Sequence, residues 1–282
     1  MEDVRYETMD RVAKVTMARP QYRNAQSRRL LTELDEAFAR AIEDTDVRVI
    51  VLAGEGKAFS AGHDLGTPEQ VEDLRTNPRS GRSFAEQNFA YSWDHFLDMS
   101  LRWRDLPKPT IAQVHGWCIF GGWIIASSMD LVVASDDAKF LTNLLQYFTL
   151  PWEVGPRKAK QILLDNRALT AAEAHELGFV NEVWARDELE AKTVELANRI
   201  AGNATFFNRL VKLTVNQVMD AAGFRASVQA AHSNYHLSEI HNRLRGAEGE
   251  GTESPRRRLG IVDELVRKSG HDPDEVDMPT PT

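Results

Sequence analysis

The sequence predicts an α/β fold, and three observations support this. A strand, strand, helix, strand order occurs once between residues 4 and 54 and begins again at residue 110, while the chain after residue 170 is dominated by helical patterns. The two units agree in architecture and not in sequence. With 282 residues, 42% of them hydrophobic, the chain can bury the core of one large domain.

The first unit begins with a predicted β-hairpin. Residues 4–20, VRYETMDRVAKVTMARP, alternate apolar and polar side chains on either side of an MDR turn, as half-buried strands do. Residues 28–43 then place apolar side chains at helical spacing. The segment VRVIVLAG follows at 47–54, and its nearly continuous apolar character predicts a buried strand.

The second unit has a strand at TIAQVHG, a helix over 122–128 and an apolar strand at DLVVAS. Residues 66–108 separate the two units and become rich in aromatic side chains toward their end. Loops of this length are usually lids or binding segments. We expect a helix over 84–103 whose apolar face either covers a pocket or belongs to the ordinary core, and the sequence does not separate these alternatives.

The C-terminal third is predicted to be helical. In TAAEAHELG, Thr170 is an N-cap with Glu173 at capping-box spacing, and Gly178 ends the helix. Further helices are expected over 187–200 and 206–219. We therefore divide the chain into a core at 1–200, C-terminal helices at 201–245 and a polar, mobile tail at 246–282 with a short helix over 260–268.

Composition excludes several classes of protein. A net charge of −8 argues against nucleic acid as a partner, because phosphate binding needs clustered Lys and Arg. The single cysteine, Cys118, excludes an internal disulfide and a CxxC metal site, so we expect no metal. The acidic N-terminus has no signal-peptide core, and no apolar run is long enough to span a membrane. We expect a cytoplasmic protein without membrane contact.

Two glycine-containing turns share the same arrangement, in which a strand is followed by Gly at a bend of the backbone. FSAGHDL, residues 59–65, follows the strand at 47–54, and FGGW, residues 120–123, follows the strand at 110–116. Each places Gly where the backbone bends or approaches a ligand, and each can present an N–H at a helix start. Two such groups aimed at one point form an oxyanion hole, in which loss of one donor raises a barrier by about 2.7–4 kcal/mol.

The turns belong to a longer series of motifs: ARPQYRNAQS, VRVIVLAGEGKAFSAGHDL, LPKPTIAQVHGWCIFGGW, MDLVVASDDAKF and RALTAAEAHELGFVNEV. Residues 4–216, which contain them, resemble the crotonase family, also called the enoyl-CoA hydratase/isomerase superfamily. The resemblance implies a crotonase-type spiral of repeated ββα units with a helical C-terminal trimerisation region. It also implies an acyl-CoA substrate, coenzyme A as part of that substrate, no tightly bound cofactor, and a homotrimer or dimer of trimers.

The resemblance implies roles for individual residues. Ala61 and Gly121 match the positions whose amides polarise a thioester carbonyl in the family. The CoA-binding positions of the family match Gly62, His63 and Asp64, together with Ala61. Lys212 matches a basic residue that reaches a CoA phosphate in relatives, although an exposed helix position would equally suit a solvated lysine.

The departures from the family pattern concern acid–base chemistry. The two positions that hold glutamates in family hydratases are Ile124 and Leu144 here. Neither side chain can activate water or deliver a proton, so we expect no ordinary hydration. Phe120 replaces the first glycine of a three-glycine run, which should reshape the acyl pocket and leave the Gly121 amide in place.

Several interpretations remain open. Glu153, one residue beyond the position of a lone acid in family isomerases, is either a proton shuttle with a raised pKa or a surface glutamate capping the helix over 156–164. His115 and His63 are alternative titrating groups, and Tyr147 and Asp130 are weaker candidates. The enzyme would then be isomerase-like or hydrolase-like. The alternative is a non-catalytic acyl-CoA binding protein on the same scaffold.

Overall fold

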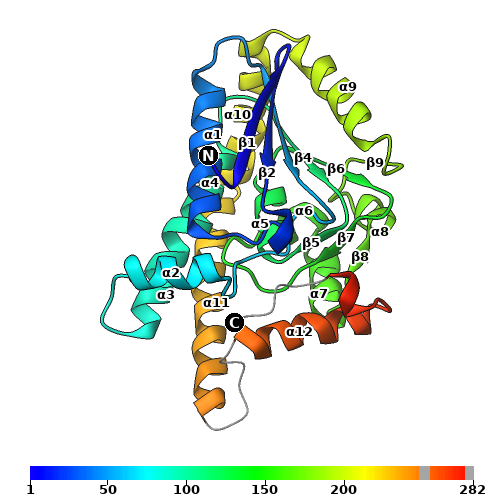
Figure 1. The fold of residues 1–282 in the computed structure, drawn as a ribbon. Coiled ribbons are helices and arrows are strands. Elements are labelled where there is room, and N and C mark those ends of the chain that lie inside the picture. Colours follow the sequence, from blue (N-terminus) through cyan, green and yellow to red (C-terminus); the bar gives the residue numbers. More distant parts are fainter. Residues whose placement is uncertain (248–254, 277–282) are drawn as a thin grey trace.

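The computed structural model describes residues 1–247 and 255–276, and Figure 1 shows its mixed α/β architecture. The larger sheet has the strand order β1-β2-β3-β4-β6-β9. Its strands are β1 (Val4–Met9), β2 (Val12–Met17), β3 (Val49–Gly54), β4 (Thr110–Val114), β6 (Leu131–Ser135) and β9 (Glu182–Trp184). β1 and β2 are antiparallel and every other pair in this sheet is parallel, so the predicted hairpin and the buried strands are confirmed.

The two faces of this sheet are covered by different helices. In β3, Ile50 and Leu52 pack into the main core with α1 (Arg28–Glu43), while Val49 and Val51 pack against α9 (Leu189–Ala201). This alternation follows from the two-residue period of a strand. Because both faces are buried, the strand has the continuous apolar sequence that predicted it.

The smaller sheet has the order β5-β7-β8 and consists of β5 (Trp117–Ile119), β7 (Lys139–Leu141) and β8 (Leu169–Thr170). Helix α5 (Gly121–Ser127) follows β5 directly and leads back to β6. The series β4, β5, α5, β6, β7 is therefore a strand–strand–helix unit that repeats the plan of the first. Its parallel neighbours β4 and β6 place α5 against the main sheet.

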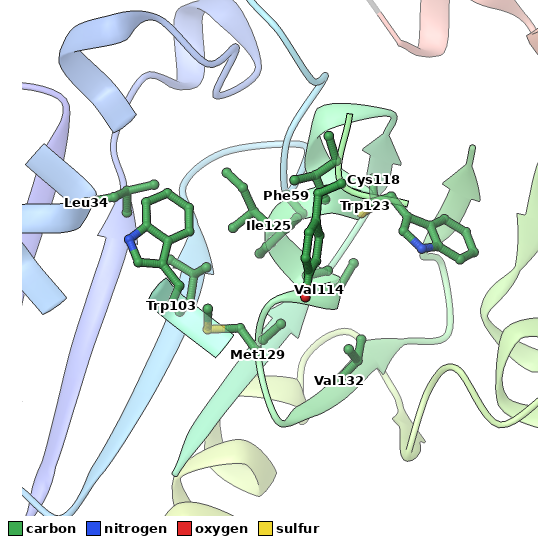
Figure 2. Close-up of a cluster of buried hydrophobic side chains, with 14 of the residues drawn as sticks. Leu34, Phe59, Trp103, Val114, Cys118, Trp123, Ile125, Met129 and Val132 are labelled. Carbon is green, nitrogen blue, oxygen red and sulfur yellow. The ribbon is translucent and has the colours of Figure 1, made fainter. Parts of the chain in front are cut away.

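The core around α5 draws on many elements, and Figure 2 shows how they meet. Ile125 of α5 and Val114 of β4 lie between Trp103 on one side and Trp123 on the other. Trp123 stacks on Phe179 with ring centroids 4.1 Å apart. Large aromatic side chains thus fix α5 on both sides.

The long segment between the two units is mostly helical. It contains α2 (Pro68–Thr76), α3 (Phe84–Ser92), a π-helical stretch η2 (Trp93–Asp98) and α4 (Met99–Arg104). The helix expected over 84–103 is confirmed, with a π-helical interruption, which is common near functional sites. Both sequence alternatives hold in part, since Trp103 is core and Phe96 also lines a cavity.

The remaining helices come after β7 in the chain. They are α6 (Leu150–Val154), α7 (Pro156–Asp165), α8 (Ala171–Glu176), α10 (Thr205–Ala221), α11 (Phe224–Ala247) and α12 (Pro255–Lys268), with short 3-10 turns at Pro20–Tyr22 and Pro273–Glu275. Thr170 and Glu173 form the predicted capping box at the start of α8. Helix α11 extends alongside α3 and η2 (Figure 1).

The C-terminal segment differs from the expected polar tail. Where a short helix was expected over 260–268, α12 begins at Pro255, and Val262, Leu265 and Val266 are buried. They pack with Val276 against the smaller sheet at Trp117 and Ile119. The polar composition of this segment concealed an apolar stripe at three- and four-residue spacing. The rest of the expected tail, at 248–254 and 277–282, lies outside the described residues.

Candidate active site

The site includes the FGGW turn, residues 120–123, at the start of α5. Phe120 precedes the helix with a φ of 43°, which places it in the left-handed region that non-glycine residues rarely adopt. This turn directs the chain from β5 into the helix and leaves the Gly121 N–H without a hydrogen-bond partner among the described residues. Gly121 therefore offers a donor at the positive end of the helix.

The other glycine turn, residues 60–64, lies against Gly121. A Cβ added to Gly62 would lie 3.1 Å from the Gly121 nitrogen, and Gly62 has a φ of 88°. The N–H of Ala61 donates to the carbonyl of Arg23 at 2.9 Å. The assignment of Ala61 as a second oxyanion-hole donor is therefore wrong for this structure, because its amide is already used within the fold.

The imidazole of His63 lies directly against the start of α5. A Cβ added to Gly121 would be 2.7 Å from Nδ1 of His63 and 2.5 Å from Oε1 of Gln26, so only glycine fits there. The ring stacks on Phe96, with centroids 3.8 Å apart. His63 thus brings a titratable side chain to the Gly121 amide, in addition to the CoA contact that the resemblance implies.

The hydrogen bonds around His63 fix its tautomer. Ser60 Oγ donates to the Asn24 carbonyl, so it accepts from Nε2 of Gln26 at 3.2 Å. Gln26 then presents its Oε1 to Nδ1 of His63 at 3.2 Å, and this nitrogen must carry the proton. Nε2 lies 3.1 Å from Oε1 of Gln146, and it is the basic nitrogen when the Gln146 amide turns to present its NH2 group.

A cavity of about 80 Å³ opens beside this cluster, and we call it the N-terminal cavity because it lies at the N-terminus of α5. All its lining residues except Leu65 and Phe96 carry polar side-chain atoms: Gln26, His63, Asp64, Gln70, Arg79, Asn88, Tyr91, Ser92, Gln146, Tyr235, His236 and Glu239. The cavity thus joins the first glycine turn, the helical segment α3–η2 and helix α11, and His63 links it to the second glycine turn at Gly121.

Sequence reasoning missed the contribution of α11. His232, His236 and Glu239 are spaced by four and three residues and therefore share one face of the helix, a pattern visible in the sequence. Nothing local indicated that this face meets Ser92 on α3, with which both histidines are hydrogen bonded. Gln26 and Gln146 were also missed, because each comes from an irregular segment.

Asp64 lines the N-terminal cavity and is also a structural residue. Its Oδ1 accepts from the backbone N–H groups of Gly66 and Thr67, and its Oδ2 pairs with the fully buried Arg19 at 3.1 Å. A carboxylate with this many donors stabilises the turn at the start of α2. Its implied contact with CoA stays a prediction.

Glu153 does not share the N-terminal cavity. It lies in a second cavity of about 530 Å³ that reaches Ser127, Met129 and Asp130, at the opposite end of α5. We call this the C-terminal cavity; the two have no lining residue in common. Because α5 spans roughly 10 Å at 1.5 Å per residue, Glu153 is poorly placed to move a proton next to a thioester held at Gly121.

The environment of Glu153 nevertheless changes the pKa of its carboxyl group. Thr149 Oγ1 donates to its Oε1 at 2.8 Å, and Trp123 Nε1 donates to its Oε2 at 3.4 Å. Burial raises the pKa of Glu153 to about 7, against the smaller lowering by these donors. Glu153 is therefore a half-buried carboxyl with the raised pKa that one interpretation expected, and it is not an exposed helix cap.

Lys212 is buried, and the expected exposed position on its helix is wrong. Its Nζ pairs with Asp130 Oδ2 at 2.8 Å and donates to the Lys108 carbonyl at 3.2 Å. Asp130 also accepts from the backbone and hydroxyl of Thr110, so it joins β4 to α10, which agrees with a role at the helix–strand junction. The ammonium lines the C-terminal cavity, and its implied contact with a CoA phosphate stays a prediction.

The other candidates lie outside the N-terminal cavity. His115 Nε2 donates to the Gly56 carbonyl at 3.0 Å, and burial lowers the pKa of His115 to about 4. Tyr147 follows Gln146 in the chain yet faces the C-terminal cavity, where its hydroxyl is buried without a partner among the described residues. Ile124 is buried in the core and Leu144 is 42% exposed, so neither position supplies an acid.

Two general properties complete the description of the site. Within residues 1–247 and 255–276, no group of three or more His, Cys, Asp or Glu side chains is arranged to hold a metal ion. Among the helices of these same residues, none combines the length and the apolar character required to cross a membrane.

Comparisons with known proteins agree with this architecture. The family model described as enoyl-CoA hydratase/isomerase matches residues 7–250. EchA13 of Mycobacterium tuberculosis (strain H37Rv) is 41% identical over 259 residues, which are 85% of this chain and 81% of that protein. The 4-chlorobenzoyl coenzyme A dehalogenase-2 of an Arthrobacter species is 34% identical over 220 residues, which are 75% of this chain and 76% of that one.

A solved structure shows the same fold. The crystal structure of a probable enoyl-CoA hydratase from Mycobacterium smegmatis superposes with a TM-score of 0.76 at 43% identity, covering 84% of this chain and 94% of that one. The family model covers most of this chain, and the expected α/β spiral with C-terminal helices is confirmed. This chain therefore belongs to the enoyl-CoA hydratase/isomerase family, the crotonase superfamily.

Proposed function

We propose that this protein is an acyl-CoA enzyme that polarises a thioester carbonyl with the Gly121 N–H and moves a proton with His63. The observation that carries the proposal is the position of the His63 imidazole against Gly121, the amide that has no partner among the described residues. A donor aimed at the carbonyl oxygen stabilises an enolate, and a base beside it can take the proton from the neighbouring carbon.

The same geometry favours isomerase- or hydrolase-like chemistry over ordinary hydration. Positions 124 and 144 hold Ile and Leu, and the raised carboxyl of Glu153 lies in the other cavity. The family relative from Arthrobacter, named as a dehalogenase of an aromatic CoA thioester, supports acyl-CoA chemistry on this scaffold without hydration. Coenzyme A is then part of the substrate, and Gly62, His63 and Asp64 are its proposed contacts.

A second candidate is a non-catalytic acyl-CoA binding protein. It is favoured by the engagement of the Ala61 N–H with Arg23, which leaves one of the two implied donors available. The presence of an imidazole at Gly121 argues against it, because a pure binding site has no need of a titratable group at the thioester.

Exchange of hydrogen for deuterium distinguishes the two candidates without knowledge of the natural substrate. In D2O, an enzyme that forms an enolate should place deuterium on carbon 2 of a bound short-chain acyl-CoA, as NMR detects. We expect this exchange, and crotonyl-CoA hydration far below the roughly 10 s⁻¹ of an ordinary enzyme. Acyl-CoA binding without exchange, isomerisation or thioester hydrolysis would establish the binding protein instead.

The implied homotrimer, or dimer of trimers, also remains a proposal. Helix α10 offers an apolar contact surface, with exposed side chains at Phe206, Phe207, Leu210, Val211, Val215 and Val218. Patches of this kind mark protein contacts more often than free surface. A cytoplasmic location is proposed on the single cysteine, which is fully buried.

A further inference from the structure

A buried serine between two histidines forms part of the wall of the N-terminal cavity. Ser92 is the last residue of α3, and its Oγ lies 2.7 Å from Nε2 of His232 and 2.5 Å from Nε2 of His236. Both histidines belong to α11, and all three residues are buried. We call these residues the Ser92 cluster. Neither the proposed proton transfer nor the oxyanion donor uses it.

The protonation of the Ser92 cluster follows from its burial. Burial lowers the pKa of His232 to about 4 and also lowers the pKa of His236, so both imidazoles are neutral at neutral pH and each carries one N–H. His232 Nδ1 has no partner among the described residues, so the proton of His232 is best used at Nε2, where it donates to Ser92.

The Ser92 hydroxyl then has one hydrogen-bonding position left. Its proton goes to Nε2 of His236, which is closer than the alternative acceptor, the Phe89 carbonyl at 3.3 Å. One oxygen lone pair receives the His232 N–H. The second lone pair has no donor among the described residues, so the cluster presents an unused acceptor.

This acceptor lies in the cavity that the His63 imidazole also lines. Ser92 and His236 line the N-terminal cavity together with His63 and Phe96. Phe96 is four residues after Ser92 and stacks on His63, which lies against Gly121. A group held at the Gly121 amide by its thioester would therefore extend its acyl chain beside the Ser92 cluster.

We propose that the Ser92 cluster recognises a hydrogen-bond donor, a hydroxyl or amide N–H, carried by a short acyl group. The inference rests on the proposed acyl-CoA function and adds its substrate class. A hydrocarbon chain of equal size would leave the Ser92 acceptor and the other polar walls of the cavity unpaired, and a site built to hydrogen-bond its ligand rejects analogues that lack the partner group.

Isosteric CoA thioesters test this preference by titration calorimetry. The pairs are 4-hydroxybutyryl-CoA with valeryl-CoA and lactoyl-CoA with isobutyryl-CoA, in which a methyl replaces the hydroxyl. We expect the hydroxyl member of at least one pair to bind about 10-fold tighter or more. In Ser92→Ala this preference should fall to within about 2-fold, because the acceptor is gone, while the methyl member keeps its affinity.

Ser100→Ala is the matched control. Ser100 is a buried serine two turns further along the same helical segment; its Oγ donates to the Phe96 carbonyl, and it does not line the N-terminal cavity. Its loss should leave the hydroxyl preference unchanged. His236→Leu is a second variant for the case that Ser92→Ala does not fold, since it removes the acceptor that orients the Ser92 hydroxyl, and it too should abolish the preference.

Each result has a distinct meaning. Equal or tighter binding of both methyl members by the unmodified protein overturns the inference, as does a preference that survives both variants. If the methyl members bind as tightly as their hydroxyl partners and exchange deuterium, the proposed function stands while the inference fails. If none of the four thioesters binds, the proposed function fails and the inference with it.

Discussion

The two ends of helix α5 have opposite chemistry. At its N-terminus, the Gly121 N–H has no partner among the described residues and lies beside His63, which lines a small cavity with polar walls. At its C-terminus, Glu153 and the Lys212–Asp130 pair line a larger cavity with an apolar wall from α10, at Phe207, Val211 and Val215. Both ends hold a perturbed or titratable group. The N-terminus adds a backbone donor without a partner among the described residues, whereas the Lys212 ammonium at the other end is already paired with Asp130.

This difference shows that a perturbed pKa does not by itself locate an active site. Burial alone accounts for the raised pKa of Glu153, and structural carboxyls in apolar surroundings share this property. Catalysis needs the titratable group and the charge-stabilising donor on the same side of the substrate. His63 satisfies this geometric condition and Glu153 does not.

The largest expected effect is a loss of turnover in His63→Gln, which tests whether His63 or Glu153 moves the proton. His63→Gln should lower turnover, or the rate of deuterium exchange, by about 10²- to 10⁴-fold, because it removes the base and keeps a polar side chain near Gln26 and Gln146. Binding of acyl-CoA should change much less than turnover, because Gln keeps a polar side chain at this proposed CoA contact. Steady-state kinetics and calorimetry on the same preparations measure both quantities.

Glu153→Gln is the control for that experiment. It should leave turnover within about 3-fold of the unmodified protein, because Glu153 lies in the other cavity. The reverse pattern, with a large loss in Glu153→Gln and none in His63→Gln, would return the proton-shuttle role to Glu153 and reject the assignment made from the cavities.

Much of the fold could be predicted because its signals are local. The alternation in β1 and β2, the helical spacing in α1 and the capping box at Thr170 are each determined by neighbouring residues. The glycine turns were also identifiable, since their motifs and order resemble one family. Each of these features depends on residues that are close together in the sequence.

The residues whose environments the sequence did not predict depend on contacts between distant segments. The Ala61 N–H is taken by the Arg23 carbonyl, and Lys212 is buried because Asp130 lies opposite it in space. Gln146 and Tyr147 are adjacent in sequence yet line different cavities. No periodicity in a single segment contains this information, so the pairing of side chains at the site required the folded structure.

The second prediction tests whether the C-terminus of α5 is structural. Asp130→Asn would leave the Lys212 ammonium buried without its carboxylate, which should lower the free energy of unfolding by about 3–5 kcal/mol. Lys212→Met should cost less, about 1–3 kcal/mol, because Asp130 keeps its Thr110 donors. Urea unfolding measures both losses.

Affinity for acyl-CoA provides the second readout for these variants. A structural pair in the C-terminal cavity predicts that the affinity of folded Lys212→Met stays within about 2-fold of the unmodified protein, a change of less than 0.5 kcal/mol. A loss of 10-fold or more at unchanged stability would instead support the CoA-phosphate contact that the resemblance implies for Lys212.

The raised pKa of Glu153 predicts a pH-dependent difference in stability. The folded protein raises the pKa of this carboxyl to about 7, so between the unfolded value near 4.5 and pH 7 the folded state holds a proton that the unfolded state has released. Its contribution to stability therefore falls as pH rises through this window and is constant above it.

Glu153→Gln resembles the protonated form at every pH. The variant should match the unmodified protein near pH 4.5 and exceed its unfolding free energy by up to about 3 kcal/mol at pH 8. Urea unfolding at both pH values checks this, with the difference between the two proteins cancelling the titration of other groups. A variant less stable at pH 8 would mean that the ionised carboxylate is favoured by Thr149 and Trp123 more than burial disfavours it, and that the C-terminal cavity is built to hold a negative charge.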